Sequence, residues 1–381
     1  MDPSAIRVAM FCGNYNYVRD GANQSLNRLV EYLLRQGVAV RVYAPIVANP
    51  AFEGAGDMVN VPSLPIPGRW EYRYPMGLPG RARRDLAAFA PNVIHIASPD
   101  ITAHRAVTWA KKRDIARVAS VHTRFETYFQ YYRLGWAEPW ARAGLRRLYQ
   151  RCDALIAPAQ STVDVLRDQK MNADISIWSR GIDQQQFNPS RRDLDWRRAK
   201  GIGDDELVVS FLGRIVMEKG LDVFADTIEA LAARGVGHRV LVIGEGPHRG
   251  WFEEALPGNS VFVGHQEGTD LARALASSDI FFNPSITETF GNVTLEAMAC
   301  ALPVVAMSAT GTTSLVEHGV NGLLAGDVEG LSKAIERYVG DASLRRAHGE
   351  NGLAKARPRD WDTINSAVLD VYARCIAKHR A

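Results

Sequence analysis

Apolar residues in the first half of the chain follow two kinds of pattern. Short continuous apolar runs, typical of strands buried on both faces, alternate with stretches in which apolar residues recur at helical spacing. The predicted strands lie at residues 6–12, 38–43, 93–97, 117–121, 154–157 and 175–178. Between the first two strands, residues 26–34 have helical spacing, and Gly37 ends that helix. Alternation of this kind predicts βαβ units and a parallel sheet.

A second series begins after a polar stretch. Residues 180–206 break the alternation, and the charged residues 191–200 within them predict a linker with a short helix. The second series has predicted strands at 207–212 and 240–243 and near Val261, Ile280 and Val304, with a helix at 221–234. The second half therefore predicts a second parallel-sheet domain.

The chain is thus predicted to have an α/β fold with two doubly wound, Rossmann-like parallel-sheet domains. Their predicted bounds are 1–180 and 181–358. The remaining residues, 359–381, contain a helical pattern at 361–378 that can stay with the second domain or cross back to the first. Parallel sheets bind ligands at the carboxyl ends of their strands, so we expect a site in a central cleft between the domains. Fold class alone does not name the reaction.

Composition and charge exclude several classes of protein. Of the 381 residues, 46% are hydrophobic and 23% are charged, which excludes a disordered or fibrous chain. The net charge of +3 is too small for a dedicated nucleic-acid binder. The four cysteines stand far apart without metal-ligand spacing, which fits a reducing cytoplasm. No apolar run reaches the ~18 residues of a membrane span, and no signal peptide is recognisable, so we expect a cytoplasmic protein.

The most specific chemical pattern is N-P-S-I-T-E-T-F-G-N-V-T-L-E-A-M-A at residues 283–299. A predicted strand leads through a proline–serine loop into a helix that starts near Asn292. The amides at that helix start, which suit a phosphate group, are those of Gly291, Asn292 and Val293. Glu288 precedes the helix and Glu296 lies about one turn inside it, so both carboxylates can accept hydrogen bonds from hydroxyls. The alternative is that Glu288 caps the helix and Glu296 is merely solvated.

A second pattern, G-R-I-V-M-E-K-G, occupies residues 213–220 after the first strand of the second domain. Arg214 and Lys219 flank this loop at the carboxyl end of the strand. Two fixed cations there can hold a diphosphate and stabilise the charge that grows on it as a leaving group. They can also be ordinary surface charges with ion pairs. With these cations no metal is needed, and the sequence has no Asp-x-Asp pattern of metal-dependent enzymes at these positions.

These two segments resemble the retaining glycosyltransferases of family 4, which have the two-domain GT-B fold. Glu288 and Glu296 match the family's E-x7-E signature, within a wider match to P-S-x-x-E-T-F-G-N-V-x-L-E-A-M-A. In that family the first glutamate contacts hydroxyls of the donor sugar and the second contacts the nucleotide ribose. The resemblance implies these roles here, and it implies that G-R-x-x-x-E-K-G binds phosphate.

The resemblance extends to shorter segments. Residues 244–247, G-E-G-P, resemble a turn near the nucleotide, and residues 263–265 resemble the segment whose backbone meets the base. His122 stands where the family has a histidine near the donor sugar, although a lone histidine is often structural. Gly21 departs from the family's Gly-Gly pair but still opens a helix start toward the diphosphate. The implied catalytic residues are His122, Arg214, Lys219 and Glu288, and the implied nucleotide-binding residues are Gly21, Gly244, Gly246, Phe290, Gly291, Asn292, Val293 and Glu296, with no metal and no cofactor besides the nucleotide sugar.

Two further segments bear on the acceptor. W-S-R-G-I-D at 178–183 resembles W-x-R-G-[VI]-D of a subgroup that includes sulfoquinovosyl-diacylglycerol synthases and the mannosyl- and glucuronosyl-transferases of bacterial glycolipids. Arg180 in it can face an anionic donor sugar or bridge the domains. Residues 123–151 interleave six arginines with aromatic side chains. This suits an anionic membrane surface and a lipid acceptor; the alternative is an aromatic helical hairpin packed on its own domain.

We therefore expect a retaining, metal-independent hexosyltransferase. It would move a sugar such as mannose, glucose or glucuronate from a UDP- or GDP-sugar to a hydroxyl of a membrane lipid or lipid-linked glycan. The first domain would bind the acceptor and the second the donor, at the inner face of the cytoplasmic membrane, with no nucleic-acid partner. The alternatives are a sugar-nucleotide epimerase or glycosyl phosphorylase on the same fold, and a nucleotide-sugar-binding protein without catalysis. An epimerase needs further acid/base carboxylates, and a phosphorylase needs a site for free phosphate.

Overall fold

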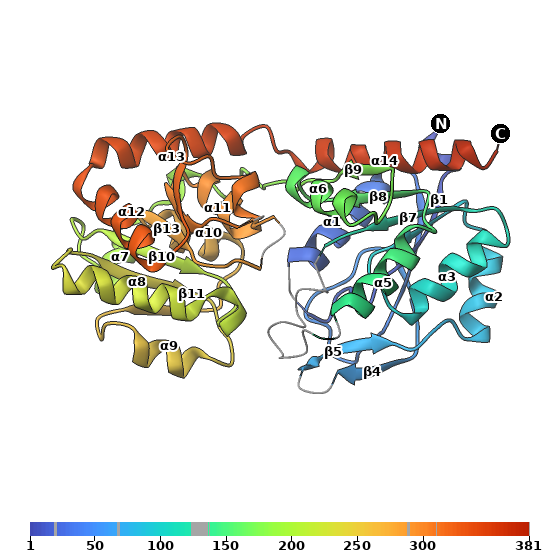
Figure 1. The fold of residues 1–381 in the computed structure, drawn as a ribbon, viewed down its shortest axis with the longest axis horizontal. Coiled ribbons are helices and arrows are strands. Elements are labelled where there is room, and N and C mark those ends of the chain that lie inside the picture. Colours follow the sequence, from blue (N-terminus) through green and yellow to red (C-terminus); the bar gives the residue numbers. More distant parts are fainter. Residues whose placement is uncertain are drawn as a thin grey trace. The chain divides into compact units, whose positions relative to one another are not determined.

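The computed structural model describes residues 1–380 except 19–20, 67–68, 123–135, 137, 288–289 and 310, and only the backbone of residues 69–71. The chain forms two compact units, Met1–Arg180 with Trp361–Ala381, and Gly181–Asp360 (Figure 1). Each unit is built on a parallel sheet with helices on both faces. The predicted fold class, two doubly wound α/β domains, is confirmed.

The sheet of the first unit has the strand order β3-β2-β1-β6-β7-β8-β9, and every neighbouring pair is parallel. Its strands are β1 (Arg7–Phe11), β2 (Ala39–Ala44), β3 (Asp57–Asn60), β6 (Val93–Ile96), β7 (Ala116–Ser120), β8 (Ala154–Ala157) and β9 (Ile175–Ile177). An antiparallel pair, β4 (Ser63–Ile66) and β5 (Arg69–Pro75), stands apart from this sheet. The predicted strands are all present, and β3, β4 and β5 are additional to them.

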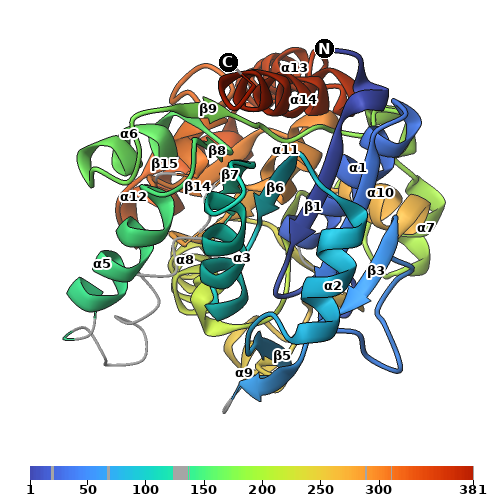
Figure 2. The same cartoon turned by 90° about the vertical axis from the view of Figure 1, so that its right-hand side faces the viewer.

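Helices cover both faces of this sheet (Figure 2). They are α1 (Gly21–Arg35), α2 (Gly80–Phe89), α3 (Ile101–Lys111), α5 (Glu138–Tyr149), α6 (Gln160–Asp168) and α14 (Trp361–Lys378), with a 3₁₀ turn, η1, at Pro3–Ala5. Side chains alternate along each strand, so Val8 and Met10 pack with α1 and α14. Ala9 and Phe11 pack on the opposite face with α2, α3 and the end of α5.

The last helix, α14, belongs to the first unit, so the chain passes between the units twice, at residues 180–181 and 360–361. Val368, Tyr372 and Cys375 on its inner face are buried against β6, β7 and β8. Asn365 accepts a hydrogen bond of 3.1 Å from the indole nitrogen of Trp178. This bond ties the start of α14 to the residues at which the chain first leaves the unit.

The sheet of the second unit has the order β12-β11-β10-β13-β14-β15, again all parallel. Its strands are β10 (Val208–Leu212), β11 (Arg239–Ile243), β12 (Val261–Gly264), β13 (Ile280–Asn283), β14 (Val304–Met307) and β15 (Gly322–Ala325). All but β15 lie where apolar runs predict them.

The helices of the second unit also lie on both faces of its sheet. They are α7 (Leu194–Ala199), α8 (Leu221–Ala233), α9 (Arg249–Ala255), α10 (Gly268–Ala276), α11 (Asn292–Ala299), α12 (Val328–Gly340) and α13 (Ala342–Ala356), with 3₁₀ turns η3 (Pro189–Arg191), η4 (Met217–Lys219) and η5 (Thr312–Ser314). Helices α8, α9 and α12 pack on one face, and α10 and α11 contact the other. Across the described part of both units, no helix is long and apolar enough to cross a membrane.

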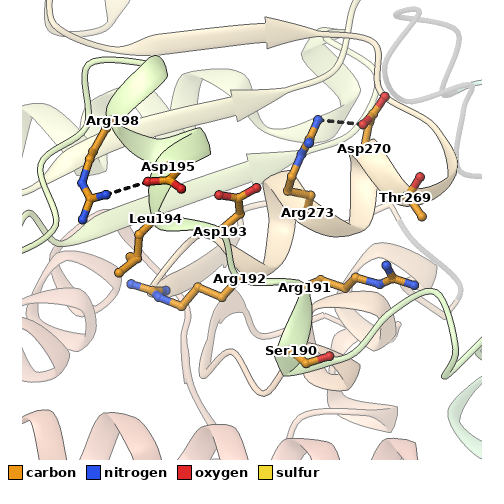
Figure 3. A pocket seen from close by; sticks show the side chains of 10 residues that line it. All are labelled: Ser190, Arg191, Arg192, Asp193, Leu194, Asp195, Arg198, Thr269, Asp270 and Arg273. Atoms are coloured by element: carbon orange, nitrogen blue, oxygen red, sulfur yellow. Dashed lines mark hydrogen bonds and ion pairs between the residues drawn. The ribbon is translucent and has the colours of Figure 1, made fainter.

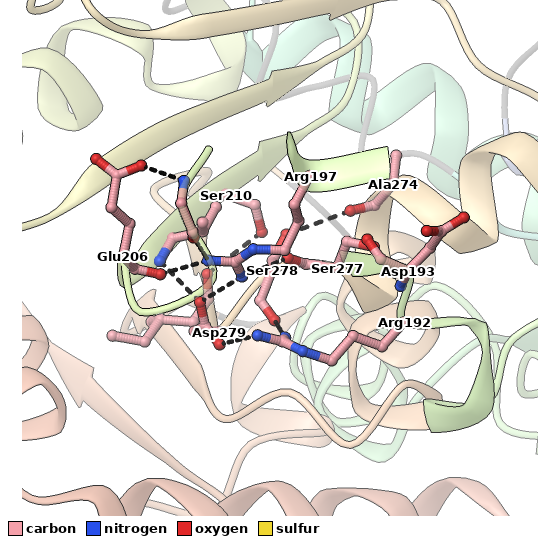
Figure 4. A network of polar contacts seen from close by, with 12 residues as sticks. Arg192, Asp193, Arg197, Glu206, Ser210, Ala274, Ser277, Ser278 and Asp279 are labelled. Carbon is pink, nitrogen blue, oxygen red and sulfur yellow. Dashed lines mark hydrogen bonds and ion pairs between the residues drawn. The ribbon is translucent and has the colours of Figure 1, made fainter. Parts of the chain in front are cut away.

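The charged stretch predicted as a linker is in part a packed element of the second unit (Figure 4). The side chain of Arg197 on α7 is completely buried. Its guanidinium donates to the carbonyl oxygen of Ser277 and to the carboxylate of Asp279, each at 3.0 Å. Arg192 donates to the other carboxylate oxygen of Asp279 at 2.8 Å. The short helix expected in this stretch is present as α7. A buried ion-paired network anchors it to the start of β13, so the stretch is packed as part of the second unit.

Candidate functional site

In the second unit, three loops follow strands that are neighbours in the sheet. They are residues 213–220 after β10, 244–247 after β11 and 284–291 after β13. Because parallel strands end at the same edge, the three loops meet at the carboxyl edge of this sheet, the edge at which such sheets bind ligands. The segments that the sequence selects for nucleotide and phosphate binding therefore lie together within one unit.

The first two loops touch so closely that only glycine fits. A Cβ atom on Gly244 would lie 1.9 Å from the carbonyl oxygen of Gly213. A Cβ atom on Gly246 would lie 2.3 Å from the carbonyl oxygen of Ile215. Both distances are far inside van der Waals contact with backbone atoms that cannot move aside. Gly244 and Gly246 thus bring the backbones of two loops together.

The loop after β10 also contacts the loop after β13. The hydroxyl of Thr287 donates a 3.0 Å hydrogen bond to the carbonyl oxygen of Glu218. Ser285 lies 3.2 Å from the Thr287 hydroxyl, and its amide donates to the side chain of Asn283 at 3.1 Å. A row of short polar side chains thus fixes the P-S-I-T segment against the phosphate-binding pattern.

Helix α11 starts at Asn292, where the sequence predicts it. Gly291 caps it with a φ of 91° and, as a glycine, has no side chain to bond the first amides. The first amides of a helix carry partial positive charge and suit an anion. Phe290, directly before the cap, is buried, and the guanidinium of Arg359 lies 5.7 Å from its ring centre. The first turn of α11, which includes Val293, therefore places partial positive charge where the three loops meet.

The predicted charged residues occupy these same elements. Arg214 is exposed in the loop after β10, and Lys219 is half-buried in the 3₁₀ turn of that loop. Glu296 is half-buried on α11, where burial and the charge of Glu296 raise the pKa of the Cys300 thiol. Glu288, to which the sequence assigns the donor sugar, lies outside the described residues.

His122 lies directly after β7 in the first unit and is buried. Its Nδ1 is 3.1 Å from the guanidinium of Arg180, and its Nε2 is 2.7 Å from the hydroxyl of Ser120. The ring meets the indole of Trp178 edge to face, with 5.4 Å between centroids. Burial, followed by the charge of Arg180 and the proximity of His95, lowers the pKa of His122 well below its usual value. The imidazole is therefore neutral, with both ring nitrogens in contacts inside the unit.

Two residues that extend the contacts of His122 and Ser120 were not predicted from the sequence. His95 on β6 lies 2.8 Å from the Ser120 hydroxyl, and its other ring nitrogen is hydrogen-bonded to the hydroxyl of Tyr372 on α14. The signal in the sequence is a histidine in the middle of the apolar run V-I-H-I, since a polar group in a buried strand needs partners. The partner 277 positions away could not be read from local spacing.

Gly21, the remaining predicted position, is the first residue of α1 and is exposed. Residues 19–20, which would show how the chain enters this helix, lie outside the described part. The structure therefore supplies a helix start at the predicted residue, whose carbonyl oxygen accepts a 2.6 Å hydrogen bond from the hydroxyl of Ser25.

The described part of the basic aromatic segment is Trp136, α5 and the two residues that follow it. Trp136 and Trp140 have 75% and 77% of their surface exposed. Arg142 pairs with Glu138 one turn away, whereas Arg147 is exposed. Leu148 and Tyr149 at the end of α5 are buried in the first unit. The helix is thus anchored at its end, with an exposed indole near its start and both half-buried and exposed arginines along it. Residues 123–135 and 137 lie outside the described part.

The second unit also has a surface pocket of about 580 Å³ away from the three loops, between the η3 turn, α7 and α10 (Figure 3). Four of its charged side chains form two ion pairs: Arg198 with Asp195 at 2.6 Å and Arg273 with Asp270 at 2.7 Å. None of the predicted site residues lines it. Over the described residues, no three His, Cys, Asp or Glu side chains form a group that could hold a metal ion.

Comparison with known proteins matches both units to glycosyltransferases. Residues 19–186 match the family described as Glycosyltransferase Family 4, and residues 206–341 match Glycosyl transferases group 1. A GDP-mannose-dependent alpha-mannosyltransferase of Corynebacterium glutamicum is 30% identical over 98% of this chain and 90% of its own. One of Mycobacterium tuberculosis is 32% identical over 96% of each chain. The sulfoquinovosyl transferase SQD2 of Arabidopsis thaliana is 28% identical over 97% of this chain and 74% of its own.

Solved structures with the same fold include a sucrose-phosphate synthase of Thermosynechococcus elongatus. It has a TM-score of 0.81 and 20% identity, over 98% of this chain and all of its own. HepE of Anabaena in complex with UDP-glucose has a TM-score of 0.74 and 20% identity, over 97% of this chain and all of its own. At this identity the likeness bears on the fold alone.

Proposed function

Because this chain belongs to the glycosyltransferases of family 4, we propose that it is a retaining hexosyltransferase that uses a nucleotide sugar without a metal ion. The family and its GT-B fold, both predicted from the sequence, are confirmed: relatives of at least 30% identity extend over nearly the whole chain, and two solved structures share the fold. Retention of configuration, the donor, the acceptor and independence of metal belong to the proposal.

The observation that carries the proposal is the meeting of three loops at one edge of the second unit's sheet. Arg214 and Lys219 lie in the first loop, and α11 starts at Asn292 from the last. Two cations beside a helix N-terminus suit the diphosphate of a nucleotide sugar. Negative charge grows on that diphosphate as its bond to the sugar breaks, and fixed positive groups stabilise it. This arrangement supports transfer without a divalent cation.

We assign the hydroxyl groups of the donor to the two glutamates. Glu296, half-buried on α11, accepts hydrogen bonds from the ribose, and Glu288 accepts them from the sugar. His122 of the first unit borders the sugar. Attack then occurs on the face that the diphosphate leaves: the acceptor oxygen bonds to the anomeric carbon, the bond to the diphosphate breaks, and a diphosphate oxygen takes the acceptor's proton.

We propose GDP-mannose as the first donor to test. Two relatives at 30% and 32% identity are named for their dependence on it, and each extends over at least 96% of this chain. SQD2, at 28% identity, is named for a different sugar, sulfoquinovose. The nearer relatives therefore favour a GDP-sugar, and UDP-sugars are the comparison.

We propose a lipid acceptor at a membrane surface. The support is α5, on which Trp140 is 77% exposed and Arg147 is exposed. Indole rings favour the boundary between water and lipid, and arginines favour anionic headgroups. The chain would then meet its acceptor from one side of the membrane without spanning it.

The test is transfer of radiolabelled sugar from GDP-mannose, UDP-glucose and UDP-glucuronate to lipids extracted from a bacterial membrane, with and without excess chelator. We expect a labelled lipid with one GDP-sugar or UDP-sugar, unchanged by chelator, and an α-linkage from an α-linked donor by NMR. The matched control is the double variant Arg214→Ala with Lys219→Ala, which should form no product. Labelled free sugar alone, an inverted linkage, or loss of activity with chelator would contradict, in turn, the acceptor, the retention and the metal independence.

A further inference from the structure

A row of buried polar side chains runs through the first unit from the end of β9 to α14. Arg180, the last residue before the chain leaves the unit, is 3.1 Å from Nδ1 of His122. Nε2 of His122 is 2.7 Å from the hydroxyl of Ser120, which is 2.8 Å from Nε2 of His95. His95 is hydrogen-bonded through Nδ1 to Tyr372. All five side chains are at most 9% exposed.

The chemistry of Arg180 decides where the proton of His122 lies. A guanidinium has only donors, so Nδ1 of His122 must accept and cannot carry a proton. A neutral imidazole then has its one proton on Nε2, from which it donates to Ser120. Ser120 can donate in turn to His95, and His95 to Tyr372, so every group in the row donates to the next.

The acceptors of Arg180 within the described residues differ from those expected of an arginine kept only for stability. A buried cation is usually paired with a carboxylate, because an unpaired buried charge is costly. Among the described residues, none of the acceptors of Arg180 is a carboxylate: besides His122 they are the carbonyl oxygens of Trp178 and Ser179, each at 3.3 Å. Its guanidinium also lies 5.0 Å from the ring centre of Trp178. The most specific acceptor of this cation is therefore a ring nitrogen of a predicted site residue.

We propose that Arg180 is a positioning residue for sugar transfer, which holds His122 in the Nε2–H tautomer and in one ring orientation. The proposal rests on the proposed function in one respect, that His122 borders the donor sugar. Because both ring nitrogens are held inside the unit, His122 moves no proton in the reaction. It presents a fixed, neutral ring. This role of Arg180 replaces the two that the sequence leaves open, a contact with an anionic donor sugar and a bridge between the domains.

The tautomer can be measured without any donor or acceptor, so this test stands apart from the proposed function. The full chain is labelled with ¹⁵N in its nine histidines, and the two-bond ¹⁵N–¹H pattern of each ring is recorded at neutral pH. The signal of His122 is the one lost in His122→Gln. We expect a proton on Nε2 alone in the wild type and in Arg180→Lys, and a mixture of tautomers in Arg180→Met. A wild-type ring with its proton on Nδ1, or on both nitrogens, would overturn the proposal.

The kinetic readout separates positioning from stability. With the donor that the transfer assay identifies, we expect Arg180→Met to lower kcat about 100-fold while the donor KM changes less than about threefold, because a misplaced group beside the reacting atoms slows chemistry more than binding. Arg180→Lys, which keeps a donor for Nδ1, should recover kcat to within about fivefold of wild type. Arg113→Met, an exposed arginine of the same unit, is the matched control with unchanged kcat. Equal kcat in Arg180→Met and wild type, or equal loss in Arg180→Lys and Arg180→Met, would contradict positioning through His122.

Discussion

The α-carbon of Gly244 faces the carbonyl oxygen of Gly213 so closely that a Cβ atom there would stand 1.9 Å from it. The φ of Gly244 is 146°, which L residues rarely adopt. Steric conflict and backbone strain therefore act together at this contact, and the two loops can meet only if residue 244 is glycine. The geometry of the proposed diphosphate site depends on this contact.

Gly244→Ala should separate the two loops. We expect a loss of about 2–4 kcal/mol in the unfolding free energy of the second unit, from overpacking and strain together. Binding of free GDP or UDP should weaken at least ~10-fold, measured by calorimetry. The matched control is Gly250→Ala on α9, where a Cβ atom meets nothing within 4 Å. That variant should bind nucleotide normally and be slightly more stable, since alanine favours a helix; normal binding in both would contradict a close contact.

Removing one of the two cations should damage turnover. We expect Arg214→Ala and Lys219→Ala each to lower kcat by at least ~10²-fold, the scale for loss of one preorganised electrostatic group. Arg346→Ala, exposed on α13 of the same unit, should leave kcat within a factor of two. The measurement is initial rate at saturating donor. Rates within threefold of wild type for both loop variants would contradict the assignment of the donor diphosphate to this loop.

The two glutamates should separate binding from chemistry. Glu296→Gln should weaken the affinity for free nucleotide, since it is assigned to the ribose, whereas Glu288→Gln should lower kcat with little change in that affinity. Nucleotide titration and turnover of both variants decide between these effects. The opposite pattern would mean that the two roles are exchanged.

Stability should fall in acid because His95 is buried and neutral. Burial lowers the pKa of His95 to about 3, whereas an unfolded chain binds a proton near pH ~6.5. Below pH ~6.5 the unfolded state therefore binds more protons than the folded state. The contribution of His95 to the free energy of unfolding then falls by up to about 1.4 kcal/mol per pH unit. Asp100, whose pKa burial raises to about 7, acts in the opposite direction over much of this range.

The comparison of wild type with His95→Gln isolates the histidine, since Asp100 is common to both. The measurement is urea denaturation at pH 7.5, 6.5 and 5.5. The unfolding free energy of the wild type should exceed that of His95→Gln by nearly the same amount at pH 7.5 and 6.5, and by about 1 kcal/mol less at pH 5.5. An advantage that does not change with pH would mean that His95 is protonated in the folded chain.

Docking on anionic lipid should depend on α5. Trp140→Ala with Arg147→Glu should reduce binding to vesicles containing phosphatidylglycerol about thirtyfold or more, since each surface arginine contributes ~1 kcal/mol and the indole adds to it. Added salt should weaken the wild type as well, because exposed charges are screened. The matched control is Trp251→Ala with Arg346→Glu in the second unit. Equal losses in the two pairs, or no binding by the wild type, would move the acceptor toward a soluble glycan.

Local pattern is enough to predict the strands that are buried on both faces. β1 is apolar after Arg7, β10 is apolar except for Ser210, and both are found where expected. β3 is half-exposed at the edge of its sheet, so its residues lack the apolar run that marks a central strand. The start of α11 was predictable because Gly291 and the residues after it are themselves the helix signal.

Partners that are far apart in sequence could not be predicted. Arg197 reads as a solvated charge until Asp279, which pairs with it, is known to lie beside it. Likewise His95 and Tyr372 are 277 positions apart, and neither residue's neighbours indicate the other. Sequence reasoning therefore identified His122 by resemblance and missed the row of side chains that holds it.

The return of α14 to the first unit has a consequence during protein synthesis. Residues 181–360 form one continuous unit, which can close as soon as it has left the ribosome. The first unit has to wait, because Val368, Tyr372 and Ile376 cover the face of its sheet that includes Val8 and Met10. Until translation reaches α14, that apolar face stays open to chaperones and to other nascent chains. The half of the enzyme that is made first is thus the last to be completed.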